Sequence, residues 1–144
     1  MIEQLLNTAR APFITVRDGC LQIGDSAYAE LTVQVHEARP IRKLFVGRRV
    51  QCHSPDGRTG KGGIFCELCP DRDRCSQRLQ LRLVYRDGEQ DRPAILELSR
   101  HSFGAFDQCL EQIGDIRKLP KILLRISAIQ HQNGWTTLLF EPLF

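Results

Sequence analysis

Four cysteines in one short window constrain the fold of this chain most strongly. Cys52, Cys66, Cys69 and Cys75 lie within 24 of its 144 residues, and Cys66 and Cys69 form a C-x2-C pair. A two-residue spacer lets one tight turn present two thiolates to the same ion, and four thiolates suit tetrahedral zinc. The spacing predicts a structural Zn²⁺ site at these four cysteines.

The segment around these cysteines has few apolar side chains that could stabilise its fold. From Gln51 to Gln77 the only substantial apolar side chains are Ile64, Phe65 and Leu68. Three such groups bury too little surface to offset the conformational entropy of ordering the segment, whereas a bound metal contributes directly to folding. We therefore expect residues 51–78 to form a metal-stapled insert.

Other interpretations of the cysteines remain open. The start of the chain lacks a basic segment, an apolar run and a small-residue cleavage site, so a cytoplasmic location is expected, where clustered cysteines bind metal more often than they form disulfides. Disulfides and buried thiols are the alternatives, and a redox C-x-x-C would open a helix, which Pro70 and Asp71 disfavour. His53 is the rival ligand to its neighbour Cys52. Adjacent side chains on an extended segment point opposite ways, so only one of the two is expected to bind, and Cys52 is preferred.

The first forty residues are predicted to form a β extension. Phe13–Val16 and Cys20–Ile23 flank Asp18-Gly19, a strong hairpin signal, and Leu31–Val35 alternates as a strand. Residues 2–10 have the apolar spacing of a short helix, and Ala38-Arg39-Pro40 is expected to break the strand before it. We expect residues 1–40 to pack on a second unit formed by residues 41–144.

The remaining elements follow an informative order. Alternation and turn signals predict a strand over 43–52, the cysteine insert, and strands over 79–86 and 94–98. Ser102 is expected to cap a helix that ends at Gly114, and strands over 122–129 and 135–140 follow. Three strands, a helix and a hairpin are the chain order of the five-stranded OB-fold barrel. The predicted class is mainly β: an OB barrel with a helix between strands 3 and 4, a four-cysteine zinc insert between strands 1 and 2, and an N-terminal hairpin. A generic α+β sheet is the alternative.

With this element order and these cysteines, the chain resembles zinc-containing OB domains that bind single-stranded DNA. The zinc-ribbon DNA-binding domain of the replication protein A large subunit, which inserts its four cysteines between the first two barrel strands, and phage single-strand-binding proteins are similar. The resemblance covers residues 43–142 and carries over Cys52, Cys66, Cys69 and Cys75 as ligands. It departs in two respects: the first cysteine pair of that ribbon is close in sequence, and residues 1–40 have no counterpart.

Basic residues indicate a polyanionic partner. The net charge is only +3, but Asp56 is the single acidic residue between Arg39 and Gly63. Arginine pairs with phosphate and also lies flat on a base, so single-stranded DNA, or RNA, is the expected partner. A solvated arginine-rich face is the plain alternative. The predicted nucleic-acid contacts are Arg48, Arg49, Arg58, Lys61, Phe65, Arg74, Arg78, Arg82, Arg86, Arg125 and Trp135.

The sequence disfavours an enzyme and leaves a protein adaptor as the second hypothesis. The four histidines are scattered, no catalytic constellation is visible, and a four-thiolate zinc leaves no open position, so we expect no enzymatic activity. An adaptor role in a larger nucleic-acid-processing complex is the second hypothesis, with protein partners bound through the zinc insert or the apolar tail 142–144. An OB-fold alone does not decide between binding nucleic acid and binding protein.

Overall fold

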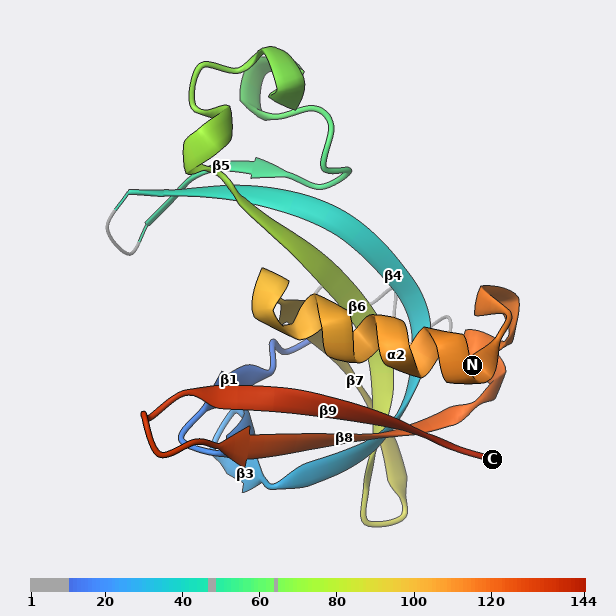
Figure 1. Cartoon of the computed structure of the whole chain (residues 1–144). Helices are drawn as coiled ribbons and strands as arrows, with labels where there is room; N and C mark the ends of the chain where they lie inside the picture. The colour runs from blue at the N-terminus through green and yellow to red at the C-terminus, as the bar shows by residue number, and fades with distance from the viewer. Residues whose placement is uncertain (1–10, 47–48, 64) are drawn as a thin grey trace.

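The computed structural model describes residues 11–46, 49–63 and 65–144, so the helix expected over 2–10 lies outside the described residues. The fold is mainly β and built from antiparallel sheets (Figure 1). Its strands are β1 Thr15–Arg17, β2 Cys20–Ile23, β3 Ser26–Tyr28, β4 Glu30–Val46, β5 Arg49–Ser54, β6 Ser76–Asp87, β7 Gln90–Leu98, β8 Leu123–Gln130 and β9 Thr136–Leu143. Its helical segments are η1 Lys61–Gly63, η2 Cys66–Leu68, η3 Arg72–Arg74, η4 Arg100–Ser102, α2 Phe103–Ile113 and η5 Ile116–Lys121.

The N-terminal hairpin forms as expected and gains a third strand. Asp18 and Gly19 take φ values of 54° and 73°, which lets a two-residue turn join β1 to β2. β3 then pairs with β2 to complete a small sheet. This sheet lies beside the larger one, because Ile14 donates its backbone N–H to the carbonyl of Ile95 on β7 at 2.8 Å.

The larger sheet has six strands in the order β7-β6-β4-β8-β9, with β5 paired to β4. β4 is its organising strand, since it pairs with β8 at its beginning, with β6 along most of its length and with β5 at its end. A register shift between Val35 and Glu37 bends β4 against β6, and Figure 1 shows the resulting long curve.

Two sequence predictions about this strand are wrong. No break occurs at Ala38-Arg39-Pro40, so the predicted boundary at residue 40 falls inside β4. Pro40 is tolerated because the β8 ladder ends at Val33 and the β5 ladder begins at Arg42, which leaves one edge of β4 unpaired between them. The single strand expected over 43–52 is instead two strands. Its first part is the end of β4 and its second part belongs to β5, which turns back antiparallel to β4 so that Val46 pairs with Arg49.

The other predicted elements are confirmed. The strands expected over 79–86, 94–98, 122–129 and 135–140 correspond to β6, β7, β8 and β9 with small differences at their ends. The expected helix is α2, ended by Gly114 at φ 86°, although Ser102 makes no side-chain cap. α2 packs its apolar stripe into the core, where the centres of the Phe106 and Phe140 rings lie 5.3 Å apart.

A five-stranded closed barrel is not confirmed. Within the described residues, no strand ladder joins the two outer strands, β7 and β9. The N-terminal segment lies at this gap: it pairs with β7 through Ile14, and Gly19 donates its N–H to Thr136 Oγ1 on β9 at 3.0 Å. We call this gap the seam.

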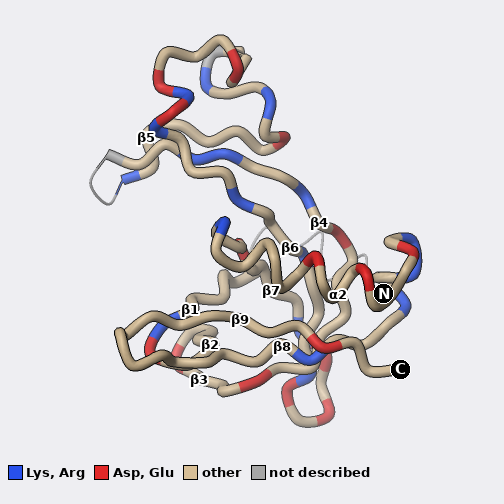
Figure 2. Tube along the Cα trace, viewed as in Figure 1, with Lys and Arg blue, Asp and Glu red and all other residues tan. Residues whose placement is uncertain are grey.

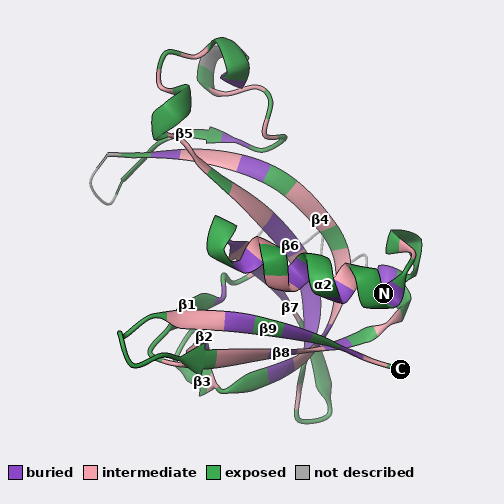
Figure 3. Ribbon diagram, viewed as in Figure 1, coloured by how far each residue is buried: buried purple, intermediate pink, exposed green. Residues whose placement is uncertain are grey.

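The molecule divides into two regions. The basic arm is residues 39–78, namely the end of β4, β5 and the cysteine insert, and Figure 1 shows it projecting above the remaining sheet. The body is everything else. The main apolar core belongs to the body, and none of its buried residues comes from 39–78 (Figure 3).

Candidate nucleic-acid interface and cysteine site

The four clustered cysteines line one small cavity in the arm. Cys52 comes from β5, Cys66 begins η2, and Cys69 and Cys75 follow the turns of η2 and η3. The cavity measures about 40 Å³, room for an ion rather than for an organic ligand. Exposed His53 does not line it, so this arrangement favours Cys52 over His53 as the fourth ligand.

Backbone hydrogen bonds hold the loops around this cavity. The Lys61 N–H donates to Cys52 Sγ at 3.3 Å, and the N–H of Cys66 donates to the carbonyl of Arg58 at 2.6 Å. The N–H of Cys69 returns to the carbonyl of Cys66 at 3.3 Å, which closes the C-x2-C turn. An N–H aimed at sulfur stabilises a thiolate more than a thiol.

The chemistry of this donor set fits a cation. The pKa of the Cys75 thiol is raised, first by burial and then by the proximity of the other three cysteines. Four sulfurs that oppose one another's ionisation are relieved by a metal that binds them as thiolates. Among the described residues, however, no three His, Cys, Asp or Glu side chains already hold the geometry of a metal site, so zinc at this cavity stays a prediction.

The two remaining cysteines lie in the body. Cys20 is half-buried on β2, and Cys109 is buried on α2, where desolvation raises its pKa. All six cysteines of the chain are free thiols, so the disulfide alternative has no support in this structure.

Charge is divided unequally between the two regions. The arm carries ten Lys and Arg against four Asp and Glu, net +6, whereas the other residues carry ten against thirteen, net −3. Figure 2 shows the basic positions following β4 and returning along the insert. Asp56 is engaged by its own turn: its Oδ1 accepts from Ser54 Oγ and from the N–H groups of Arg58 and Thr59, and these bonds lower the pKa of Asp56 to about 2.

Most predicted nucleic-acid contacts gather on this arm. Arg49, Arg58 and Lys61 are exposed, and within the described residues no carboxylate lies within ion-pair distance of them. Arg74 is exposed but paired with Asp71 at 3.1 Å. Arg78 is half-buried, with its guanidinium 5.2 Å from the centre of the Phe45 ring.

The predicted aromatic contacts are both exposed, Phe65 at 62% on the insert and Trp135 at 63% at the start of the β9 segment. Arg48 lies outside the described residues.

Besides Trp135, three predicted arginine contacts lie on the body. Arg86 pairs with Asp91 at 2.9 Å near the β6–β7 turn. Arg125 pairs with Glu141 at 3.4 Å, and Arg82 is half-buried on β6 with its Nε atom buried. Alternation along a strand identified these side chains as polar-facing, but it carried no information about the carboxylates that cross-strand pairing places beside them.

The structure also brings forward residues that the sequence predictions did not name as contacts. Arg42, Arg72 and Arg100 line a polar hollow of about 520 Å³ between the insert and η4, together with Glu67, Asp73, Cys75 and Gln77. Lys43 Nζ is 2.6 Å from Glu97 Oε1 on β7, and both side chains are largely buried. Arg42 and Lys43 belonged to a visible basic run, whereas nothing local in the sequence pointed to Arg100.

Comparison of the chain with protein-family models, with curated proteins and with solved structures finds no match. Within the described residues, no helix combines the length and the apolar character that crossing a bilayer requires.

Proposed function

We propose that this protein binds single-stranded nucleic acid, most naturally DNA, largely independently of sequence. The observation that carries the proposal is the segregation of charge, +6 on the arm against −3 elsewhere. A cationic surface next to exposed rings such as Phe65 suits a flexible polyanion with accessible bases. Arg78 lying over Phe45 adds a planar cation of the kind that both pairs with phosphate and stacks on bases.

A structural zinc at Cys52, Cys66, Cys69 and Cys75 belongs to this proposal. Bound there, it would contribute Lewis-acid cross-links that fix the insert. The supporting observations are the cavity that all four cysteines line and the N–H of Lys61 directed at Cys52 Sγ. The insert would then hold Arg58 and Lys61 in place rather than take part in chemistry.

We also infer that the six-stranded sheet is a variant of the OB-fold. In its support, β4, β6 and β7 precede α2, and the β8–β9 hairpin follows, with β4 pairing to both β6 and β8. OB barrels are partly open, and here the opening falls at the seam.

Salt dependence of binding tests the proposed function. Anisotropy of a labelled oligothymidine should give a log–log slope against salt of about −0.7 for each phosphate neutralised. The triple variant Arg49→Ala, Arg58→Ala, Lys61→Ala should lower the magnitude of this slope by about 2. A control with the same charge change, Arg86→Ala, Arg92→Ala, Arg117→Ala, removes exposed arginines that already pair with carboxylates on the body and should change it little.

No binding at low salt, or an affinity that does not change with salt concentration, would contradict the proposal. Equal competition by a duplex of the same length would redirect it to double-stranded nucleic acid, and an oligouridine arm of the titration separates RNA from DNA.

A protein adaptor is the second candidate, favoured by one observation. The outward face of the β8–β9 hairpin exposes Leu123, Ile129 and Leu139, and Phe144 beyond it is 87% exposed. Exposed apolar groups gathered on one face are typical of protein contacts. If the adaptor role holds, Leu139→Glu should abolish capture of a cellular partner while leaving oligonucleotide binding unchanged.

A further inference from the structure

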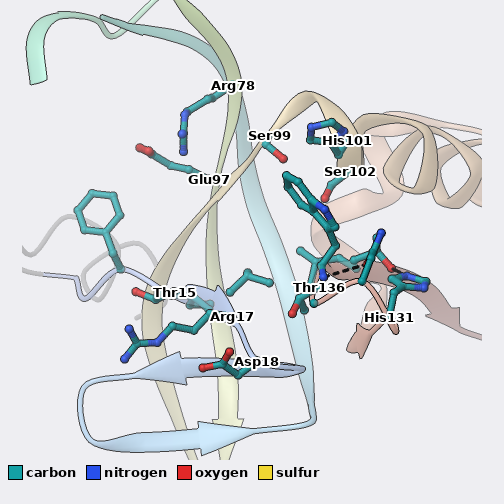
Figure 4. A pocket seen from close by; sticks show the side chains of 18 residues that line it. Thr15, Arg17, Asp18, Arg78, Glu97, Ser99, His101, Ser102, His131 and Thr136 are labelled. Carbon is teal, nitrogen blue, oxygen red and sulfur yellow. Dashed lines mark hydrogen bonds between the residues drawn. The ribbon is translucent and has the colours of Figure 1, made fainter. Parts of the chain in front are cut away.

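The seam between β7 and β9 contains a groove of about 1000 Å³. Its walls come from three parts of the molecule: residues 13–18, the end of β7 and η4 together with Arg78 on β6, and the β8–β9 hairpin. Figure 4 shows side chains of all three around the same hollow, with Arg78 and Glu97 on one side, Arg17 and Asp18 on another, and His101 and His131 on a third. The N-terminal extension therefore builds part of a site instead of only covering the sheet.

Two large rings line this groove and remain exposed to solvent. Phe13 is 54% exposed on the N-terminal wall, and Trp135 is 63% exposed on the hairpin wall. An exposed apolar ring inside a concave surface offers a stacking face to a ligand.

Contacts with neighbouring groups position both rings. The Trp135 ring lies 5.8 Å from the His101 ring, its backbone N–H donates to Asn133 Oδ1 at 3.1 Å, and its carbonyl accepts from the N–H of His131 at 2.7 Å. The ammonium of Lys43 lies 5.6 Å from the centre of the Phe13 ring. Rings positioned before a ligand arrives lose less conformational entropy when it binds.

A hollow with an excess of cationic side chains lies next to the groove, on the side of the arm. His101 lines the groove, and its neighbour Arg100 lines the adjoining hollow with Arg42 and Arg72. Glu67 and Asp73 share that hollow, and Asp73 contacts Arg72 at 3.7 Å, whereas no carboxylate of the described residues is within ion-pair distance of Arg42 or Arg100. A backbone phosphate in the hollow and bases in the groove would belong to one continuous strand.

We infer that the seam groove is the base-binding site, in which Phe13 and Trp135 stack unpaired bases while Arg100 takes a phosphate between the groove and the arm. The inference rests on the proposed function and adds to it the place where the bases lie. Rings recessed in a groove reach the faces of bases that are free of a duplex stack, so the site selects single strands. A π-face is common to all bases, so this contact adds affinity with little sequence preference.

The single tryptophan of the chain reports on this site directly. Titrating the metal-replete full chain with short oligothymidines should quench its emission in parallel with the anisotropy of a labelled strand. Trp135→Ala and Phe13→Ala should each weaken binding by about 5- to 150-fold, the range of one base–aromatic stack, without changing the salt slope. Arg100→Ala should instead lower the magnitude of the slope by about 0.7.

Phe144→Ala is the matched control, because it also removes an exposed aromatic ring but lies outside the groove lining, and it should bind as the unaltered chain does. Thermal melts confirm that each variant is folded. If the unaltered protein binds DNA while tryptophan emission stays constant and both ring variants retain full affinity, the groove inference is overturned and the proposed function stands. If the unaltered protein does not bind at low salt, the proposed function fails first.

Discussion

The basic arm and the body are stabilised in different ways. The body buries a contiguous apolar cluster that joins β2, β4, β6, β7, β8, β9 and α2. The arm buries only Ile41, Leu44, Cys66 and the small polar Ser54 among its described residues, and Figure 3 shows the insert mostly exposed. Charge follows the same division, with the excess of positive charge on the region that has least packing.

This contrast shows how a small chain can present a cationic surface. Packing like-charged side chains into an apolar core would cost more than it returns, since buried charges must be paired. The arm instead keeps its guanidiniums in solvent, and its loops meet at four sulfurs. The arm and the body should therefore respond independently to perturbation.

Loss of a cysteine ligand is the largest expected effect. Cys66→Ser should lower the zinc content of purified protein from about one equivalent to near zero, since a structural site needs its full ligand set. Because such a site contributes on the order of 10 kcal/mol to local folding, the amide NMR signals of the insert should collapse to random-coil positions. Signals from β7, α2 and β9 should keep their dispersion.

Cys20→Ser is the control for this experiment, because Cys20 lies on β2 away from the cysteine cavity. It should retain metal. Full zinc content in Cys66→Ser, or unfolding of the body with the arm, would contradict the separation of the two regions.

A core truncation should produce the opposite pattern. Phe106 is 2% exposed and packs on Phe140, so Phe106→Ala should lower the free energy of unfolding of the body by about 3–5 kcal/mol. Urea denaturation followed by far-ultraviolet circular dichroism measures this loss. Zinc content under native conditions should not change, and a variant that loses its metal while still folded would show that the arm depends on core packing.

Local patterns in the sequence predicted the elements whose cause is local. Alternation over 79–86 predicted β6, and the apolar spacing with Gly114 predicted α2. The cysteine spacing also identified four residues that the fold gathers at one cavity.

Features set by distant partners were missed. Pro40 indicates a strand break, yet it is accommodated because one edge of β4 is unpaired there. The groove depends on Phe13 and His101, which are far apart in the sequence and carry no shared motif. Arg86 and Arg125 looked like free cations until cross-strand pairing placed Asp91 and Glu141 beside them.

The smallest effect concerns the turn that leads into the cysteine cavity. Asp56 accepts three hydrogen bonds that shape this turn just before Lys61 reaches Cys52 Sγ. Asp56→Ala should therefore speed zinc loss to a chelator by a few-fold, whereas Asp73→Ala, which removes an exposed acid of the same insert, should not.

The pH dependence of the Asp56 effect follows from its depressed pKa of about 2, against an ordinary value of 3.8. A carboxyl whose folded pKa is depressed stabilises above its unfolded value, and that stabilisation is lost as pH falls through the folded value. Between about pH 8 and pH 5 the Asp56 carboxylate stays ionised. The rate of zinc loss from Asp56→Ala divided by the rate from the unaltered protein should therefore stay constant, even though thiolate protonation accelerates both rates. A ratio that shrinks toward unity within this range would mean that the pKa of Asp56 is raised above its ordinary value of 3.8 rather than lowered.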